Sequence, residues 1–145
     1  MEELLAGFQV NAPSPAAQIN SAEAALGVTL PADYRTFLEM SDGGAGYIVE
    51  DYLVLWRAAE LHPFNRDVEV SEYADGLVGF GSDGGGEMFA FDTRFQPPPV
   101  VIVSFIGMSH EDAIVVADDF TGLLRRMKQA AGSLFDPKPN SGAEL

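Results

Sequence analysis

Apolar residues recur at helical spacing in two short segments near the start of the chain. These positions are Ile19, Ala22, Ala25, Leu26, Tyr34, Phe37 and Leu38. In the first segment Ser14-Pro15 provides an N-cap and a proline at the first helical position, and Gly27 stands where a helix ends. The pattern predicts one helix over residues 15–26 and a second helix after Pro31, ended by the turn Asp42-Gly43-Gly44.

From Gly46 the chain changes to short runs of β-branched and aromatic residues, which are typical of strands. The runs are 47–49, 53–56, 77–80, 88–91, 100–105 and 113–116. The glycine-rich residues 81–86 separate two of them and predict a β-hairpin in which at least one glycine of residues 84–86 has a positive φ. Residues 57–70 suggest a short helix that Pro63 interrupts or kinks.

A last helix is expected after Asp118 or Asp119, either of which can cap it. Its apolar face consists of Phe120, Leu123, Leu124 and Met127. The chain of 145 residues suits one domain, which we place at residues 1–135. We expect residues 136–145 to form a flexible tail, because their first seven positions lack apolar residues.

The charge of the chain is strongly negative. Eight basic residues against 22 acidic ones give a net charge of 8 − 22, or −14. Between Glu39 and Asp92 there are 12 acidic residues and two basic ones, so this span carries 2 − 12, or −10, of that charge. Such a field repels nucleic acid and anionic membranes and attracts cationic partners, although it would also serve solubility alone.

The chain contains no cysteine, which excludes disulfides, thiolate zinc sites and cysteine nucleophiles. Its first five residues are acidic and apolar, where a signal peptide would be basic. The longest apolar run, residues 100–108, is about half the length that a membrane-spanning helix needs. We therefore expect a cytoplasmic protein that does not enter a membrane.

The sequence offers little chemistry for catalysis. Gly79, Gly81 and Gly84 match the spacing of a dinucleotide-binding motif, but a strand-like run follows them where that motif needs a helix. The two histidines, His62 and His110, stand alone without the spacing of a metal site. We expect neither a cofactor nor a metal ion, and no enzymatic activity.

The segment from Leu26 to Gly44 resembles the opening motif LGxxLPxDYxxFLxxxNGG of the SUKH superfamily, with Asp42 where asparagine is more common. Residues 79–92 look like the glycine-rich hairpin of that family, and residues 120–127 resemble its closing helix. The resemblance implies an α+β fold with a central, mostly antiparallel sheet, an N-terminal helix pair and a C-terminal helix packed against it. It also implies protein binding, since the superfamily includes bacterial toxin-immunity proteins and fungal cell-wall regulators of the Smi/Knr type.

The acid-rich middle of the chain is the expected partner-binding surface, with tyrosines as anchors. The predicted residues are Glu50, Asp51, Tyr52, Asp67, Glu69, Glu72, Tyr73 and Asp75. One hypothesis is an immunity protein whose acidic face covers the basic active-site cleft of a toxin, such as a nuclease or a deaminase. The alternative is an intracellular scaffold or regulator of cell-wall assembly, for which the charge is incidental. The sequence leaves the oligomeric state and the contiguity of the acidic face open.

Overall fold

The computed structural model describes residues 2–130 of the chain. Seven strands form one sheet in which every strand pairs antiparallel with the next along the chain. The strands are β1 (Phe8–Val10), β2 (Gly44–Ile48), β3 (Asp51–Leu55), β4 (Leu77–Ser82), β5 (Glu87–Asp92), β6 (Val100–Ser104) and β7 (Ile114–Ala117). The predicted flexible tail, residues 136–145, lies outside the described residues.

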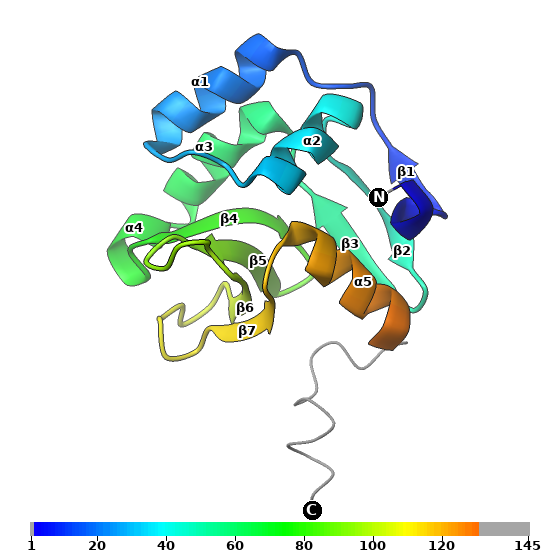
Figure 1. The fold of residues 1–145 in the computed structure, drawn as a ribbon. Helices are drawn as coiled ribbons and strands as arrows, with labels where there is room; N and C mark the ends of the chain where they lie inside the picture. The colour runs from blue at the N-terminus through cyan, green and yellow to red at the C-terminus, as the bar shows by residue number, and fades with distance from the viewer. Residues whose placement is uncertain (1, 131–145) are drawn as a thin grey trace, which may run out of the picture.

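The helices lie against this sheet at several places. They are the 3-10 helix η1 (Glu2–Leu5) and the α-helices α1 (Ala16–Leu26), α2 (Ala32–Met40), α3 (Ala58–Asp67), α4 (Val70–Tyr73) and α5 (Phe120–Ala130). Figure 1 shows α1, α2 and α3 together above the sheet, α5 in front of it and α4 at the left edge. The expected α+β fold, with its N-terminal helix pair and closing helix, is confirmed.

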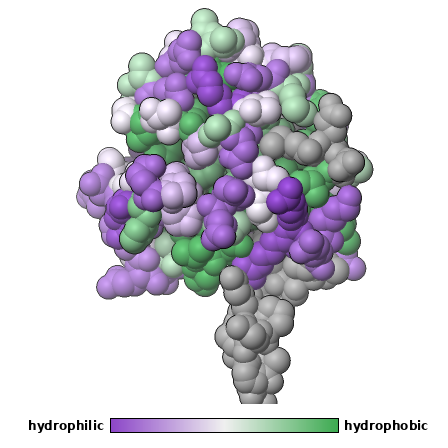
Figure 2. All heavy atoms as spheres, in the orientation of Figure 1, coloured by the Kyte–Doolittle hydropathy of each residue, from purple (hydrophilic) through white to green (hydrophobic). Residues whose placement is uncertain are grey.

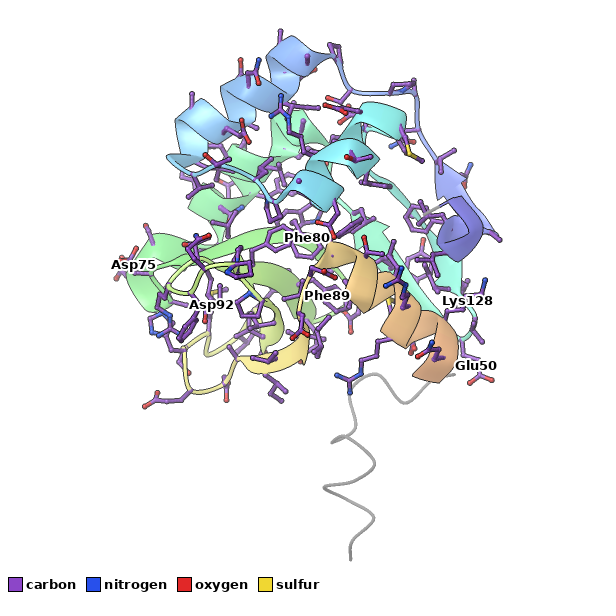
Figure 3. The ribbon with its side chains drawn as sticks, in the orientation of Figure 1. Glu50, Asp75, Phe80, Phe89, Asp92 and Lys128 are labelled. Atoms are coloured by element: carbon purple, nitrogen blue, oxygen red, sulfur yellow. The ribbon has the colours of Figure 1, made fainter. Side chains whose placement is uncertain are left out.

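An aromatic cluster joins α2 and α5 to the middle of the sheet. The rings belong to Tyr34, Phe37, Phe80, Phe91 and Phe120, all of which are buried. The centroids of Phe80 and Phe91 are 4.4 Å apart, and that of Tyr34 is 5.3 Å from each of them. Figure 3 places Phe80 between α2 and the sheet. Because such ring pairs pack at these separations, the cluster fixes both helices on one face.

A buried asparagine bonds to the backbone of β4 where β3 and β4 are not paired. Strands β3 and β4 pair over only two residue pairs, so the first half of β4 has no strand neighbour on that side. Asn65 of α3 takes this place: its Nδ2 donates to the Gly79 carbonyl (2.9 Å), and its Oδ1 accepts from the Gly79 N–H (2.7 Å). The amide therefore satisfies backbone groups that would be costly to bury unpaired, and it positions α3.

Two predicted helix ends are wrong in detail. Helix α1 begins at Ala16 with Pro15 as its N-cap residue, while Ser14 is buried and its N–H donates to the Leu38 carbonyl (2.9 Å). Helix α2 is not ended by a left-handed glycine, because Ser41 follows it in an extended conformation. Tertiary contacts explain both differences, because Ser14 and Ser41 connect these helices to each other and to the sheet.

The glycines of the turn after α2 and of the β4–β5 hairpin include three with positive φ angles, and Gly84 confirms the prediction made for residues 84–86. Gly43 has φ 75° and Gly44 has φ 150°. A Cβ atom on Gly43 would lie 2.6 Å from the Leu55 carbonyl oxygen, so close approach of the backbone requires glycine there. Gly84 has φ 84° in the turn between β4 and β5, which form the predicted hairpin. Pro63 does not interrupt its helix, since α3 continues from Ala58 to Asp67.

We expect Tyr34→Phe to stabilise the protein. The hydroxyl of Tyr34 is buried and has no hydrogen-bond partner among residues 2–130, and burial followed by the Asp42 carboxylate raises the pKa of this group. Removing a buried, unsatisfied hydroxyl relieves its desolvation cost, so the free energy of unfolding should rise by about 1 kcal/mol. Urea denaturation of both proteins measures the change, with Tyr47→Phe on the surface as a neutral control. A loss of stability would show that the hydroxyl is hydrogen-bonded in solution.

Candidate partner-binding surface

The structure divides the predicted partner-binding residues into two groups. Glu50, Asp51 and Tyr52 lie at the turn between β2 and β3, and the other five lie between the end of α3 and the start of β4. Figure 3 labels Glu50 and Asp75 on opposite sides of the molecule. The two groups therefore do not form one continuous acidic face.

The group at the β2–β3 turn is a weak candidate for a binding surface. Asp51 is only 8% exposed, so it offers little surface to a partner. Its place at the start of β3 turns the side chain inward, since alternate residues of a strand face opposite sides. Tyr52 packs edge-on against Tyr47 with 4.9 Å between the ring centroids. Lys128 of α5 is labelled beside Glu50 in Figure 3, which weakens the negative field of this region.

The second group forms a compact acidic surface. Asp67, Glu69, Glu72, Tyr73 and Asp75 are all exposed, and Tyr73 is 53% exposed. Figure 2 shows hydrophilic residues along the left side of the molecule, where Figure 1 places α4.

The local fold explains this exposure. Glu69 has the left-handed conformation, with φ 59° and ψ 44°, and so turns the chain sharply between α3 and α4. Val70 and Ala74 anchor α4 in the core, at 3% and 0% exposure. Because a helix presents residues on all sides, the positions between these anchors must face outward.

The loop between β6 and β7 adds residues to this surface that the sequence analysis missed. The His110 Nε2 atom lies 2.7 Å from the Asp75 carbonyl oxygen, which brings the loop against the residues after α4. A hollow of about 420 Å³ between loop and helices is lined by Tyr73, Phe105 and Met108 together with Asp67 and Glu69. No spacing in the sequence links these segments, which are separated by 35 positions at the His110 contact.

We name this region the α4 surface. It consists of Asp67, Glu69, Glu72, Tyr73, Asp75, Ile106, Glu111 and Asp112, all of them exposed. One of the six carboxylates pairs with a guanidinium: the Arg66 Nε atom is 3.3 Å from the Asp67 Oδ1 atom. Ile106 is 87% exposed, so the surface combines negative charge with an apolar and an aromatic side chain.

Like charges crowd each other next to the α4 surface. Burial raises the pKa of Glu87 at the start of β5, and the carboxylates of Asp83 and Asp112 raise it further. Binding a cationic group here would relieve this repulsion.

A second exposed feature is the edge strand β7. Ile114 and Val115 are 59% and 52% exposed, and Figure 2 shows hydrophobic atoms at the bottom of the domain where Figure 1 places β7. The Arg126 side chain of α5 donates to the Val116 carbonyl (2.9 Å), and acidic pairs precede and follow the strand. Charged and covered edges of this kind oppose pairing with a second sheet.

An ion pair holds the loop that follows β5. The Nε and Nη2 atoms of Arg94 donate to the two carboxylate oxygens of Asp92 at 2.9 and 2.8 Å, and the Arg94 backbone N–H donates to the same group (3.2 Å). These hydrogen bonds, opposed in part by burial, lower the pKa of Asp92. The Asp92 side chain is therefore a charged anchor at the end of β5.

Asp92→Asn should lower stability at neutral pH but not in acid. The lowered pKa of Asp92 means that its stabilisation is present above the unfolded-state pKa and is lost as the pH falls through the folded-state pKa. We expect a loss of about 1 kcal/mol at neutral pH, reduced because Arg94 is partly exposed. Urea denaturation at neutral pH and at steps into acid should show the two proteins converging. A constant difference would contradict a role for the charge.

The groups considered for catalysis stay apart in the structure. Gly79 and Gly81 lie in β4 and Gly84 in the following turn, which leads into β5, so the hairpin interpretation of the glycine motif is confirmed. His62 lies on α3 and His110 in the β6–β7 loop. Within residues 2–130, no three histidine, aspartate or glutamate side chains come together in a cluster that could hold a metal ion.

A known protein family matches most of the chain. The family model described as the SMI1 / KNR4 family (SUKH-1) matches residues 13–126. No curated protein matches the chain. None of the helices in the described part of the chain has the length and apolar character that crossing a membrane requires.

Proposed function

This chain belongs to the SMI1 / KNR4 family (SUKH-1), and on that premise we propose that it is a non-enzymatic immunity protein that binds and neutralises a basic toxin domain. The α4 surface is its binding site. The toxin belongs to a class whose active-site cleft is positively charged, such as a nuclease or a deaminase.

The observation that carries this proposal is the composition of the α4 surface. Six exposed carboxylates lie on the same two segments as Tyr73 and Ile106, and the fold brings these segments together. The carboxylates steer a cationic cleft toward the protein and oppose anionic or nucleic-acid ligands. Tyrosine and an exposed aliphatic side chain then supply the apolar contact area that holds an interface together.

Affinity capture tests this proposal. The full chain is immobilised and used to capture proteins from its native cell, in parallel with a variant that carries lysine at Asp67, Glu72 and Asp75. The proposal predicts one basic protein that wild type retains and the variant does not. Expression of that protein alone should arrest growth of a test cell, and co-expression of the chain should restore growth.

Two results would contradict the proposal. If the captured protein is harmless and belongs to cell-wall assembly, the chain is a scaffold or regulator instead. If both forms of the chain capture the same protein equally well, the α4 surface is not the binding site.

A further inference from the structure

Two neighbouring hollows lie beside the α4 surface. The larger, of about 1020 Å³, lies between the segment that joins α1 to α2 and the loop that follows β5. The smaller, of about 520 Å³, lies between α1, α3, α4 and the start of β4. Val28 and Thr93 line both of them, so the two hollows are neighbours on either side of these residues. We call the combined feature the Val28 groove.

The two ends of the Val28 groove differ in chemistry. Val28, Pro31, Pro97 and Pro98 give the larger hollow apolar walls, and the three prolines are rigid and have no backbone N–H to donate. The smaller hollow has an apolar lining of Leu26, Val70 and Leu77 and carries the carboxylates of Glu69, Glu72 and Asp75. Five acidic residues and two arginines line the whole groove, which gives it a charge of 2 − 5, or −3.

Hydrogen bonds fix the walls of the Val28 groove in place. The Oγ1 and the backbone N–H of Thr93 donate to the Gly76 carbonyl at 2.6 and 2.8 Å, which ties the loop after β5 to the start of β4. On the opposite wall, the Glu23 carboxylate accepts from the Leu30 N–H (2.8 Å). Asp33 accepts from the backbone of Thr121 (2.9 Å) at the start of α5. A groove held in this way loses little conformational entropy when a ligand enters it.

We infer that the Val28 groove binds an extended segment of the protein partner, with apolar residues in the larger hollow and a lysine or arginine in the smaller one. The inference rests on the proposed function, which supplies a basic partner. A basic side chain fits the smaller hollow because its aliphatic stem covers Leu26 and Val70 while its charged head reaches Glu72 and Asp75. An acidic segment is excluded by the net charge of the walls.

Defined peptides test the groove without the native partner. The first is a short blocked peptide with two arginines next to a stretch of valine, leucine and proline. In the second peptide serine replaces the apolar residues, and in the third glutamine replaces the arginines. The first peptide, titrated into isotope-labelled full chain, should shift the amide resonances of Val28, Thr93 and Glu72 and bind about tenfold more tightly than either control.

Variants locate the binding. Val28→Lys places a cation at the centre of the groove and should weaken the first peptide about tenfold, whereas Ala24→Lys on the exposed side of α1 makes the same charge change and should not. Thermal unfolding establishes that each variant is folded, and Pro98→Lys replaces Val28→Lys if that protein does not fold. Equal affinity for the first two peptides, or resonance shifts confined to residues outside the groove, would overturn the inference.

Binding of variants to the captured partner distinguishes the groove inference from the proposed function. If Val28→Lys binds it as wild type does while reversal of Asp67, Glu72 and Asp75 weakens binding, the groove inference fails and the proposed function stands. If neither variant changes the affinity, both fail. If both variants weaken binding of the partner, the result supports both the groove inference and the proposed function.

Discussion

Reversing Asp67, Glu72 and Asp75 to lysine should slow association with the captured partner by about 10- to 100-fold at low salt. These three carboxylates lie on the α4 surface, and their reversal changes the net charge from −14 to −8. A cationic cleft approaching the variant no longer meets an attractive field, so the loss should appear in the association rate more than in the dissociation rate. Three residues are changed together because one exposed charge contributes only about 0 to 1 kcal/mol.

The matched control reverses Glu39, Glu50 and Asp118, which are exposed and lie on other parts of the molecule. It changes the net charge by the same amount and includes one residue that the sequence analysis assigned to the binding site. Association rates of wild type, variant and control are measured at low and high salt. The proposal is refuted if the control slows association as strongly as the α4 variant, or if the wild-type rate does not depend on salt.

Phe80→Ala should remove about 4 kcal/mol from the free energy of unfolding. Phe80 is fully buried, and its ring lies 4.4 Å from Phe91, 5.3 Å from Tyr34 and 5.9 Å from Phe120. Truncation deletes the contacts that connect β4 with α2 and α5 and leaves a cavity that this well-packed cluster cannot close. A domain of this size is stable by about 5 to 15 kcal/mol, so the variant should be close to unfolding.

Chemical denaturation with urea measures this loss of stability, and two further variants serve as controls. Phe80→Leu keeps most of the volume and should cost clearly less. Tyr47→Ala removes an aromatic side chain that is 60% exposed and should cost less than about 1 kcal/mol. A small effect of Phe80→Ala, similar to that of Tyr47→Ala, would show that the aromatic cluster does not hold the helices on the sheet.

Most of the longer elements of the fold were predictable because their signals are local. The apolar spacing of Ile19, Ala22 and Leu26 reports a helix from neighbouring residues alone. The glycines of residues 81–86 report a tight turn in the same way, and Gly84 has the left-handed conformation that such a turn needs. Asp119 was predicted as a cap from its position, and its Oδ1 atom accepts from the Gly122 N–H (2.7 Å).

Details that depend on distant partners were predicted less well. Ser14 has the sequence of an N-cap, but its backbone instead bonds to α2. No feature of the sequence marked Asn65, yet its side chain bonds to the backbone of Gly79 in β4, 14 positions further along the chain. Asp51 looked like another exposed acid of the middle segment, and its burial follows from the register that pairs Ile48 with Asp51 at the hairpin turn.

The sequence by itself determined that this protein is acidic, that its acid concentrates between Glu39 and Asp92, and where most helices and strands lie, although η1, β1 and α4 were not predicted. Only the tertiary structure decided which of those acids are neighbours. It separates Glu50 from Asp75, brings the loop of His110 against Asp75, and places Val28 and Thr93 together between two hollows. The physical reason is that secondary structure follows from interactions over a few residues, whereas a surface is assembled by strand pairing and helix packing between segments far apart in the chain.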